Sequence, residues 1–171
     1  INQGDGTFVL GPVDGAIRVE APRTDVPAGA SFVDYDRDGF IDLWVTQNSV
    51  DYEPQQDRLY KGDGTGNTLD VTTDMGLKTK AWSAISDLNA GLSHSNAWSA
   101  AACDLNGDGN AELLAASYGR APNHLWQAQG PEAGFAFLNQ SVPSGYAFDE
   151  RVDWSDNESA RCWCKLHPTD P

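Results

Sequence analysis

The sequence predicts an all-β protein made of β-propeller-type blades, each with four short antiparallel strands. Three observations lead to this fold class: an internal repeat, an alternation of apolar and polar residues with a period of two, and a composition rich in turn-forming residues. The 171 residues include 19 Asp but only 6 Glu, together with 17 Gly and 9 Pro. Because Asp and Gly favour turns whereas Glu favours helices, the acidic residues indicate loops between strands.

The internal repeat is the strongest of these observations. Residues 30–43 align without gaps on residues 100–113, at an offset of 70. Downstream, Asp57-Arg-Leu-Tyr-Lys61 matches Asn123-His-Leu-Trp-Gln127. A third block follows in the same order, at residues 69–76 and 138–145. Three blocks in one order mark a repeat architecture rather than a chance similarity.

The repeat divides the chain into two full units and two partial ones. Residues 29–98 form the unit with the first acidic loop, and residues 99–150 form the unit with the second. Residues 1–28 are predicted to be the tail of a preceding unit, and residues 151–171 the divergent start of a further unit or a linker. Because a closed propeller has about four to eight blades, the two full units are expected to be part of a larger or assembled propeller.

Each full unit is expected to contain four short strands. In residues 40–47 the side chains of Ile41, Leu43 and Val45 alternate with polar neighbours, as in a strand with one apolar face. Trp44 is expected on the opposite, exposed face. Further strands are expected at residues 30–33, 57–61, 100–103, 111–117 and 123–127.

Two acidic loops carry the residues whose chemistry is recognisable. They read Asp34-x-Asp36-x-Asp38-Gly39-x-x-Asp42 and Asp104-x-Asn106-x-Asp108-Gly109-x-x-Glu112. Oxygens at positions 1, 3 and 5 converge on one point, glycine at position 6 permits a sharp turn, and position 7 offers its carbonyl. Because Ca²⁺ accepts six to eight oxygen ligands, the sequence predicts about two calcium ions. The expected ligands are the side chains of Asp34, Asp36, Asp38, Asp42, Asp104, Asn106, Asp108 and Glu112, and the carbonyls of Phe40 and Asn110.

Two other interpretations of these loops are disfavoured. An EF-hand begins identically but needs a bidentate Glu at position 12 and flanking helices, whereas position 12 here is Val45 or Ala115 in a strand pattern. A solvated acidic turn is disfavoured because like charges about 4 Å apart cost about 1 to 4 kcal/mol per pair. The first loop, with four carboxylates, is expected to bind calcium more tightly than the second, with three.

The charge of the chain excludes several classes of partner. With 25 acidic and 11 basic residues, the formal net charge is −14. Such a surface is repelled by the phosphates of nucleic acids and by anionic lipids. No stretch approaches the roughly 18 to 20 apolar residues of a membrane-spanning helix. Neither nucleic-acid binding nor a membrane span is therefore expected.

Taken together, the motifs resemble FG-GAP/VCBS-type repeats. In these repeats an Asp-x-Asp-x-Asp-Gly loop lies between strands and is followed by an Arg-Leu-Tyr or His-Leu-Trp strand and a Gly-Asp-Gly-Thr turn, as at residues 58–60, 124–126 and 62–65. The segment Leu69-Asp-Val-Thr-Thr-Asp-Met-Gly-Leu77 is similar to the ASPIC/UnbV group of secreted bacterial proteins. The resemblance covers roughly residues 1–146. It implies a calcium-binding propeller like that of integrin alpha chains, with the ten residues above as ligands.

Several residues outside the loops receive structural interpretations. Cys103 aligns with Val33, which suggests a small core residue, and His124 aligns with Arg58 and is expected on a strand surface. Between residues 78 and 91 apolar side chains recur every third position, which permits a short helical turn.

The tryptophans and the C-terminal cysteines leave alternatives open. The tryptophans either line a propeller rim that binds sugars or a partner, or pack between blades: Trp44, Trp82, Trp98, Trp154 and Trp163. Cys162 and Cys164, with His167 nearby, fit a local disulfide or an external pairing better than a zinc site, which needs a fourth ligand.

The sequence therefore predicts a non-catalytic, calcium-stabilised repeat module, extracellular or periplasmic, for adhesion, recognition or assembly. Calcium at millimolar levels outside cells keeps even weak loops filled. Its partner is expected to be a protein or a glycan. A self-assembling subunit, whose blades are completed by neighbouring chains, is the first alternative. A polysaccharide-acting enzyme is the second, although the sequence contains no nucleophile elbow and no phosphate-binding loop.

Overall fold

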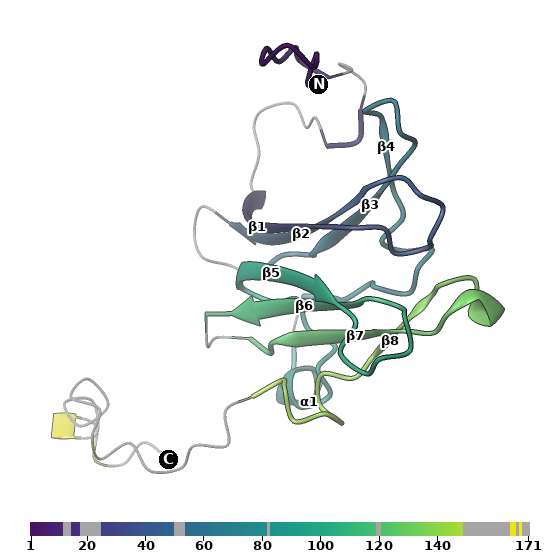
Figure 1. Cartoon of the computed structure of the whole chain (residues 1–171). Coiled ribbons are helices and arrows are strands. Elements are labelled where there is room, and N and C mark those ends of the chain that lie inside the picture. Colours follow the sequence, from purple (N-terminus) through teal and green to yellow (C-terminus); the bar gives the residue numbers. More distant parts are fainter. Residues whose placement is uncertain are drawn as a thin grey trace.

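Two copies of one short-strand pattern give two four-stranded antiparallel sheets, with strand orders β1-β2-β3-β4 and β5-β6-β7-β8 (Figure 1). The computed structural model describes residues 1–11, 15–17, 25–49, 54–81, 83–118, 121–148, 165, 166 and 168. The first sheet consists of β1 (Asp25–Val33), β2 (Asp42–Ser49), β3 (Arg58–Gly62) and β4 (Thr68–Asp70). The second consists of β5 (Ala97–Cys103), β6 (Glu112–Ser117), β7 (His124–Ala128) and β8 (Phe137–Asn139). The predicted all-β fold, with four short antiparallel strands in each blade-like sheet, is confirmed.

The predicted helical turn is also present. Helix α1 (Ile85–Asn89) lies in the connection between the sheets, and a 3₁₀ turn (Pro131–Ala133) lies between β7 and β8. Most of residues 151–171, predicted to open a further unit, lie outside the described part of the chain. The same holds for these residues: Trp82, Trp154, Cys162, Trp163, Cys164 and His167.

The last residue of each acidic loop fixes its loop in the same way in both sheets. Asp42 Oδ2 accepts a hydrogen bond from the backbone N–H of Tyr35 at 3.0 Å. Glu112 Oε2 accepts one from the N–H of Leu105 at 2.8 Å. Both carboxylates are fully buried, so position 9 of each loop closes the turn between the first two strands of its sheet.

Both sheets share a second contact, which joins the end of the second strand to the residue just before the third strand. The N–H of Gln47 donates to Asp57 Oδ1 at 2.9 Å, and the N–H of Ser117 donates to Asn123 Oδ1 at 2.7 Å. Asp57 and Asn123 are the first residues of the matching sequence blocks. The repeat in the sequence is therefore a repeat of backbone-fixing side chains as well as of strands.

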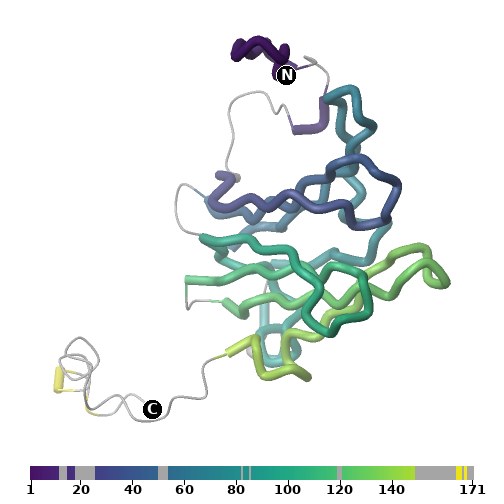
Figure 2. Tube along the Cα trace, in the orientation of Figure 1, coloured from purple at the N-terminus to yellow at the C-terminus, as the bar shows by residue number. Residues whose placement is uncertain are grey.

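The two sheets pack against each other, with β5 beside β1 and β2 (Figures 1 and 2). Gly29 allows β1 to approach β5 closely, because a Cβ atom there would lie 2.7 Å from the nitrogen of Ala100 and 2.9 Å from the Cα of Ser99. Larger side chains fill the joint elsewhere, for example where the ring of Tyr35, in the loop after β1, lies 6.1 Å from that of Phe137 in the outer strand β8 (centroid to centroid). The joint thus combines small residues at the first strands with aromatic residues farther out.

Trp44 was expected on an exposed face, and this expectation is wrong. Its side chain is fully buried between the sheets, and its Nε1 donates to the carbonyl of Leu114 at 2.9 Å. Ile41, expected on the apolar face, is instead 61% exposed. The face of β2 that carries Trp44 is the one that the second sheet covers, so packing between blades is the interpretation that holds for this tryptophan.

Cys103 and His124 also differ from expectation, for the same reason. Cys103 is exposed rather than in the core, because it lies on the face of the second sheet that no other described strand or sheet covers. His124 is 1% exposed rather than on a surface, because its face of β7 packs toward the first sheet. Trp98 remains exposed, with its ring 6.0 Å from that of Tyr118.

Candidate metal sites in the two acidic loops

The first acidic loop connects β1 to β2 in a tight turn. Gly39 has a φ of 86°, and Arg37 adopts the left-handed region with a φ of 59°. Backbone N–H groups then donate to loop carboxylates: Gly39 to Asp34 Oδ2 at 3.1 Å, and Phe40 to Asp38 Oδ1 at 2.9 Å. The turn therefore points its acidic side chains toward the interior of the loop.

Three carboxylates of this loop converge. Oxygens of Asp34, Asp36 and Asp42 all lie within 4.8 Å of one another. Asp34 Oδ1 is buried and accepts no hydrogen bond from the described residues, although its partner oxygen does. Calcium ligands lie about 2.3 to 2.6 Å from the ion, so oxygens on one ion are up to about 5 Å apart. The donor set, its spacing and the unpaired oxygen fit a hard divalent cation.

Asp38 does not join this group, because it faces Lys61 of β3. Lys61 Nζ lies 2.6 Å from Asp38 Oδ2 and also ion-pairs with Asp36 Oδ2. Burial alone lowers the pKa of Lys61, but the hydrogen bonds to the two carboxylates outweigh burial and hold that pKa above its ordinary value. The same lysine, with the N–H of Phe40, lowers the pKa of Asp38.

Burial and neighbouring carboxylates raise two pKa values in and beside the converging group. Burial and the nearby carboxylate of Asp36 raise the pKa of Tyr35 to about 12. Burial also raises the pKa of Asp42, against the opposing effect of the N–H groups of Gly62 and Tyr35. Gly62 N donates to Asp42 Oδ1 at 2.9 Å. Both shifts are due first to burial, and the neighbouring carboxylates add to them, so further negative charge is costly at this site.

The second loop connects β5 to β6 but uses its side chains differently. Asp104 accepts hydrogen bonds from the N–H groups of Gly107 at 2.7 Å and Gly109 at 2.8 Å. Asn106 Nδ2 donates to Asp108 Oδ2 at 3.0 Å. Asp108 Oδ1 accepts from the Asn110 backbone at 2.8 Å and from its side-chain amide at 2.9 Å. Amide groups therefore occupy both Asp108 oxygens.

The carboxylates of the second loop do not converge as those of the first do. Within the described ranges, the first loop gives the one group of three acidic, histidine or cysteine side chains with metal-ligand spacing. Glu112 Oε1 is nevertheless buried without a hydrogen-bond partner in the part of the chain that the structure describes. Arg37 reaches across from the first loop, and its Nη2 donates to Asn110 Oδ1 at 2.7 Å. The backbone N–H of Asn110 and the Asn106 amide, with a smaller effect of the Arg37 charge, lower the pKa of Asp108.

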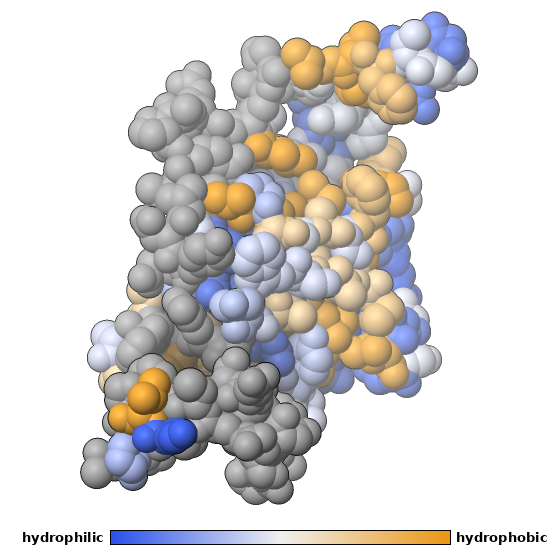
Figure 3. Space-filling model, turned by 90° about the vertical axis from the view of Figure 1, so that its left-hand side faces the viewer, coloured by the Kyte–Doolittle hydropathy of each residue, from blue (hydrophilic) through white to orange (hydrophobic). Residues whose placement is uncertain are grey.

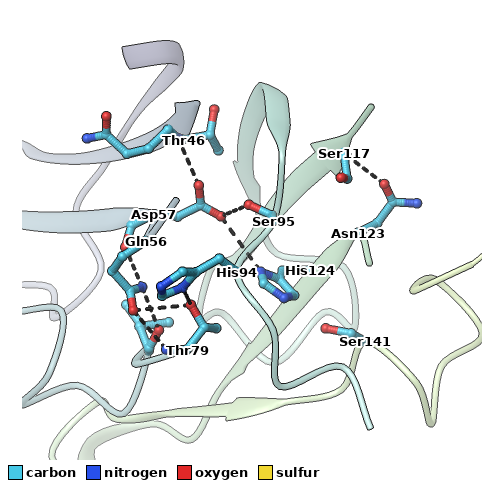
Figure 4. Close-up of polar contacts among 12 residues, drawn as sticks. Thr46, Gln56, Asp57, Thr79, His94, Ser95, Ser117, Asn123, His124 and Ser141 are labelled. Atoms are coloured by element: carbon cyan, nitrogen blue, oxygen red, sulfur yellow. Dashed lines mark hydrogen bonds and ion pairs between the residues drawn. The ribbon is translucent and has the colours of Figure 1, made fainter. Parts of the chain in front are cut away.

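A buried polar cluster lies at the opposite end of the strands, and no sequence motif indicates it (Figure 4). Ser95 Oγ donates to Asp57 Oδ2 at 2.5 Å, and His124 Nδ1 lies 3.7 Å from the same oxygen. His94 Nδ1 and Thr79 Oγ1 are 2.6 Å apart. The repeat gave one signal for this cluster, because Asp57 matches Asn123 and both fix the second strand.

This cluster has the residue types of a nucleophilic triad but not its arrangement. In a triad the histidine bonds the serine and is oriented by the carboxylate, whereas here Ser95 bonds Asp57 directly. Ser95, Asp57 and His124 are also almost fully buried at the joint, away from solvent. The arrangement favours a structural role between the two sheets.

The comparisons with known proteins identify repeats across this part of the chain. One protein-family model, described as an FG-GAP-like repeat, matches residues 34–115, and another, described as an FG-GAP repeat, matches residues 96–135. No curated protein and no solved structure matches the chain. Among the described helices, none has the length and apolar character to cross a membrane.

Proposed function

We propose that the chain, an FG-GAP-type repeat protein across residues 34–135, is a calcium-stabilised, non-catalytic module for adhesion or recognition outside the cell or in the periplasm. One observation carries the calcium part of the proposal: oxygens of Asp34, Asp36 and Asp42 converge within 4.8 Å around a buried, unpaired oxygen of Asp34. The repeat family supports the adhesion or recognition role, because such repeats build binding modules.

The residues proposed to hold calcium follow from the two loops. In the first loop they are the side chains of Asp34, Asp36, Asp38 and Asp42 and the carbonyl of Phe40. In the second they are the side chains of Asp104, Asn106, Asp108 and Glu112 and the carbonyl of Asn110. A bound cation would neutralise the clustered carboxylates. The chain's own N–H donors, from Gly39 and Tyr35, already orient Asp34 and Asp42 for that role.

Chelation tests this proposal directly. Calcium at about one hundred times its Kd stabilises the folded state by about 2.7 kcal/mol, which corresponds to about 5 to 10 °C in Tm for a chain of this size. We expect the Tm in excess chelator to be lower by this amount and calcium, but not magnesium, to restore it. Calorimetric titration of Asp34→Asn and Asp104→Asn should show that the first substitution removes the tighter binding. An unchanged Tm in excess chelator would contradict the proposal.

A second candidate function is self-assembly, and the uncovered sheet faces favour it. Figure 3 shows apolar surface at the end of the molecule with the first sheet. Among the residues before and within that sheet, Phe8 and Phe32 are each 76% exposed. At the other end Leu105 is 55% exposed beside a pocket that Leu125 and Gln127 line. The positions in the first sheet that match Leu105 and Leu125 are Tyr35 and Leu59, and both are buried in the joint.

The joint therefore shows which face packs on which, and a second copy could repeat it head to tail. Sedimentation velocity over a range of concentrations distinguishes the two candidates. A species of 18.4 kDa at every concentration, with and without calcium, contradicts self-assembly. A Leu125→Asp variant, which places a charge on the uncovered face, should abolish any larger species, whereas a charge at exposed Leu166 should not.

A further inference from the structure

The ammonium group of Lys61 lies among the carboxylates of the first acidic loop. We infer that Lys61 is a tethered counter-ion, which stabilises this loop when calcium is absent and competes with calcium for Asp36 and Asp38. This inference deepens the proposed function and rests on calcium binding by the first loop. Lys61 lies in β3, outside the loop motif, and in this inference it controls the affinity of the first loop for calcium.

Lys61 contacts two carboxylates of the first acidic loop. Its Nζ ion-pairs with Asp36 and lies 2.6 Å from Asp38 Oδ2. Asp36 belongs to the converging group, so one carboxylate serves both the ammonium and the proposed cation site. Asp38, the other partner, is the acidic residue that the converging group lacks. Both carboxylates can turn fully toward a metal ion only after Lys61 has left them.

The backbone next to Lys61 holds the lysine at the loop. The N–H of Gly62 donates to Asp42 Oδ1 at 2.9 Å, which fixes the end of β3 to position 9 of the loop. A Cβ atom on Gly62 would lie 2.2 Å from the carbonyl oxygen of Ile41, so this contact is backbone to backbone. The ammonium also lies 5.9 Å from the centre of the Tyr35 ring. Lys61 is therefore positioned by the fold rather than by the ion pairs alone.

Charge determines what happens when the two cations compete. The loop carries four carboxylates within nine residues, and one ammonium offsets a single charge. A dication offsets two, and an ammonium left about 6 Å away is repelled by it, which weakens binding about ten-fold even at the dielectric constant of water. The Lys61 side chain is 33% exposed, and its flexible stem allows the ammonium to move into solvent.

The second unit has no lysine at the matching position. The position that matches Lys61 is Gln127, which is neutral and lines the pocket beside Asn106 and Glu112. Lys61→Gln therefore gives the first loop the residue that the protein already uses at the second. Lys80→Gln is the matched control, because it also removes a lysine ion pair, with Asp87 at 2.6 Å, but away from both acidic loops.

The experiment measures calcium affinity by calorimetry and Tm in chelator for wild type, Lys61→Gln, Lys61→Arg and Lys80→Gln. Lys61→Gln should bind calcium at the first loop about ten-fold more tightly. In chelator it should melt at a lower temperature than Lys80→Gln. Lys61→Arg keeps the charge and should keep the wild-type affinity.

Two outcomes separate the inference from the function on which it rests. If wild type binds calcium and Lys61→Gln binds it no more tightly, the inference is overturned while the calcium site stands. If no variant binds calcium, the proposed function is overturned. The Tm in chelator then decides alone whether Lys61 is the counter-ion of the loop, and equal values for Lys61→Gln and Lys80→Gln overturn that role.

Discussion

The two units of this protein have the same backbone framework but different side-chain surroundings. Position 9 of each loop closes the turn, through Asp42 or Glu112, and Asp57 or Asn123 fixes the end of each second strand. In the first loop three carboxylates converge beside a lysine, whereas in the second the amide groups bond Asp108. The repeat therefore specifies the backbone of each loop, and the neighbours of the loop decide where its carboxylates point.

The sheet faces differ in the same way. The face of the first sheet that carries Trp44 and Leu59 is covered by the second sheet, and both side chains are fully buried. The matching residues of the second sheet are Leu114 and Leu125, which are only half-buried. Equivalent positions thus contribute differently to stability, according to whether another sheet packs on them.

The largest effect that tests this comparison is expected from Trp44→Ala against Leu114→Ala. Removing the buried indole leaves a cavity between the sheets and should cost about 3 to 5 kcal/mol of unfolding free energy. Leu114→Ala truncates a half-buried side chain, keeps the carbonyl that accepts the Trp44 N–H, and should cost about 1 kcal/mol. Urea denaturation of both variants measures the difference. Equal costs would mean that the two faces are equally covered in solution.

A smaller effect is expected from the position that closes each loop. Asp42 accepts hydrogen bonds from Tyr35 and Gly62, so Asp42→Ala leaves two buried N–H groups unpaired and should cost about 2 to 4 kcal/mol. Glu112→Ala leaves one partly buried N–H group unpaired, that of Leu105, and should cost about 1 to 2 kcal/mol. Denaturation in chelator measures the cost of these lost hydrogen bonds without a contribution from calcium binding. A larger cost for Glu112→Ala would contradict the comparison.

The smallest effect is expected from pH at the joint. Burial lowers the pKa of His94 below its ordinary value near 6.5, an effect that His124 reinforces and Asp57 opposes. The unfolded chain then binds more protons than the folded one in this window. Stability from His94 is therefore fully present above pH about 6.5 and is lost as the pH falls toward the lower, folded-state pKa.

Unfolding curves at intervals between about pH 5 and 8 measure this dependence, in a range where most carboxylates stay ionised. His94→Gln retains a group that can bond Thr79 Oγ1 and should have a shallower slope than wild type. A slope that is unchanged in His94→Gln would assign the pH dependence to another group.

Much of the fold could be predicted from the sequence, because strand patterns and turns are local. The period-two segments and the repeat located the first three strands of each sheet but not β4 and β8, and the spacing between residues 78 and 91 indicated the turn that became α1. The burial of Trp44 and His124 and the exposure of Cys103 could not be predicted in this way. They depend on which face of each sheet the other covers, and a period of two marks two faces without stating which is inside.

The candidate site was predictable in position but not in detail. The acidic motif located both loops, yet Lys61 lies on another strand, 25 residues from Asp36, and no motif spacing connects them. The alignment of the two units does indicate a difference here, because Lys61 matches Gln127 of the second unit. The contact of Arg37 with Asn110 gave no such signal, because it joins two different units.

The contact at Gly29 determines how further units can be added. Backbone meets backbone where β1 passes β5, whereas indole and phenyl rings separate the sheets farther out. Each unit is therefore thinner at its first strand than toward its last. Wedges of this shape, added in series, turn about an axis beside their thin edges, so this seam of small residues bends a succession of blades into an arc.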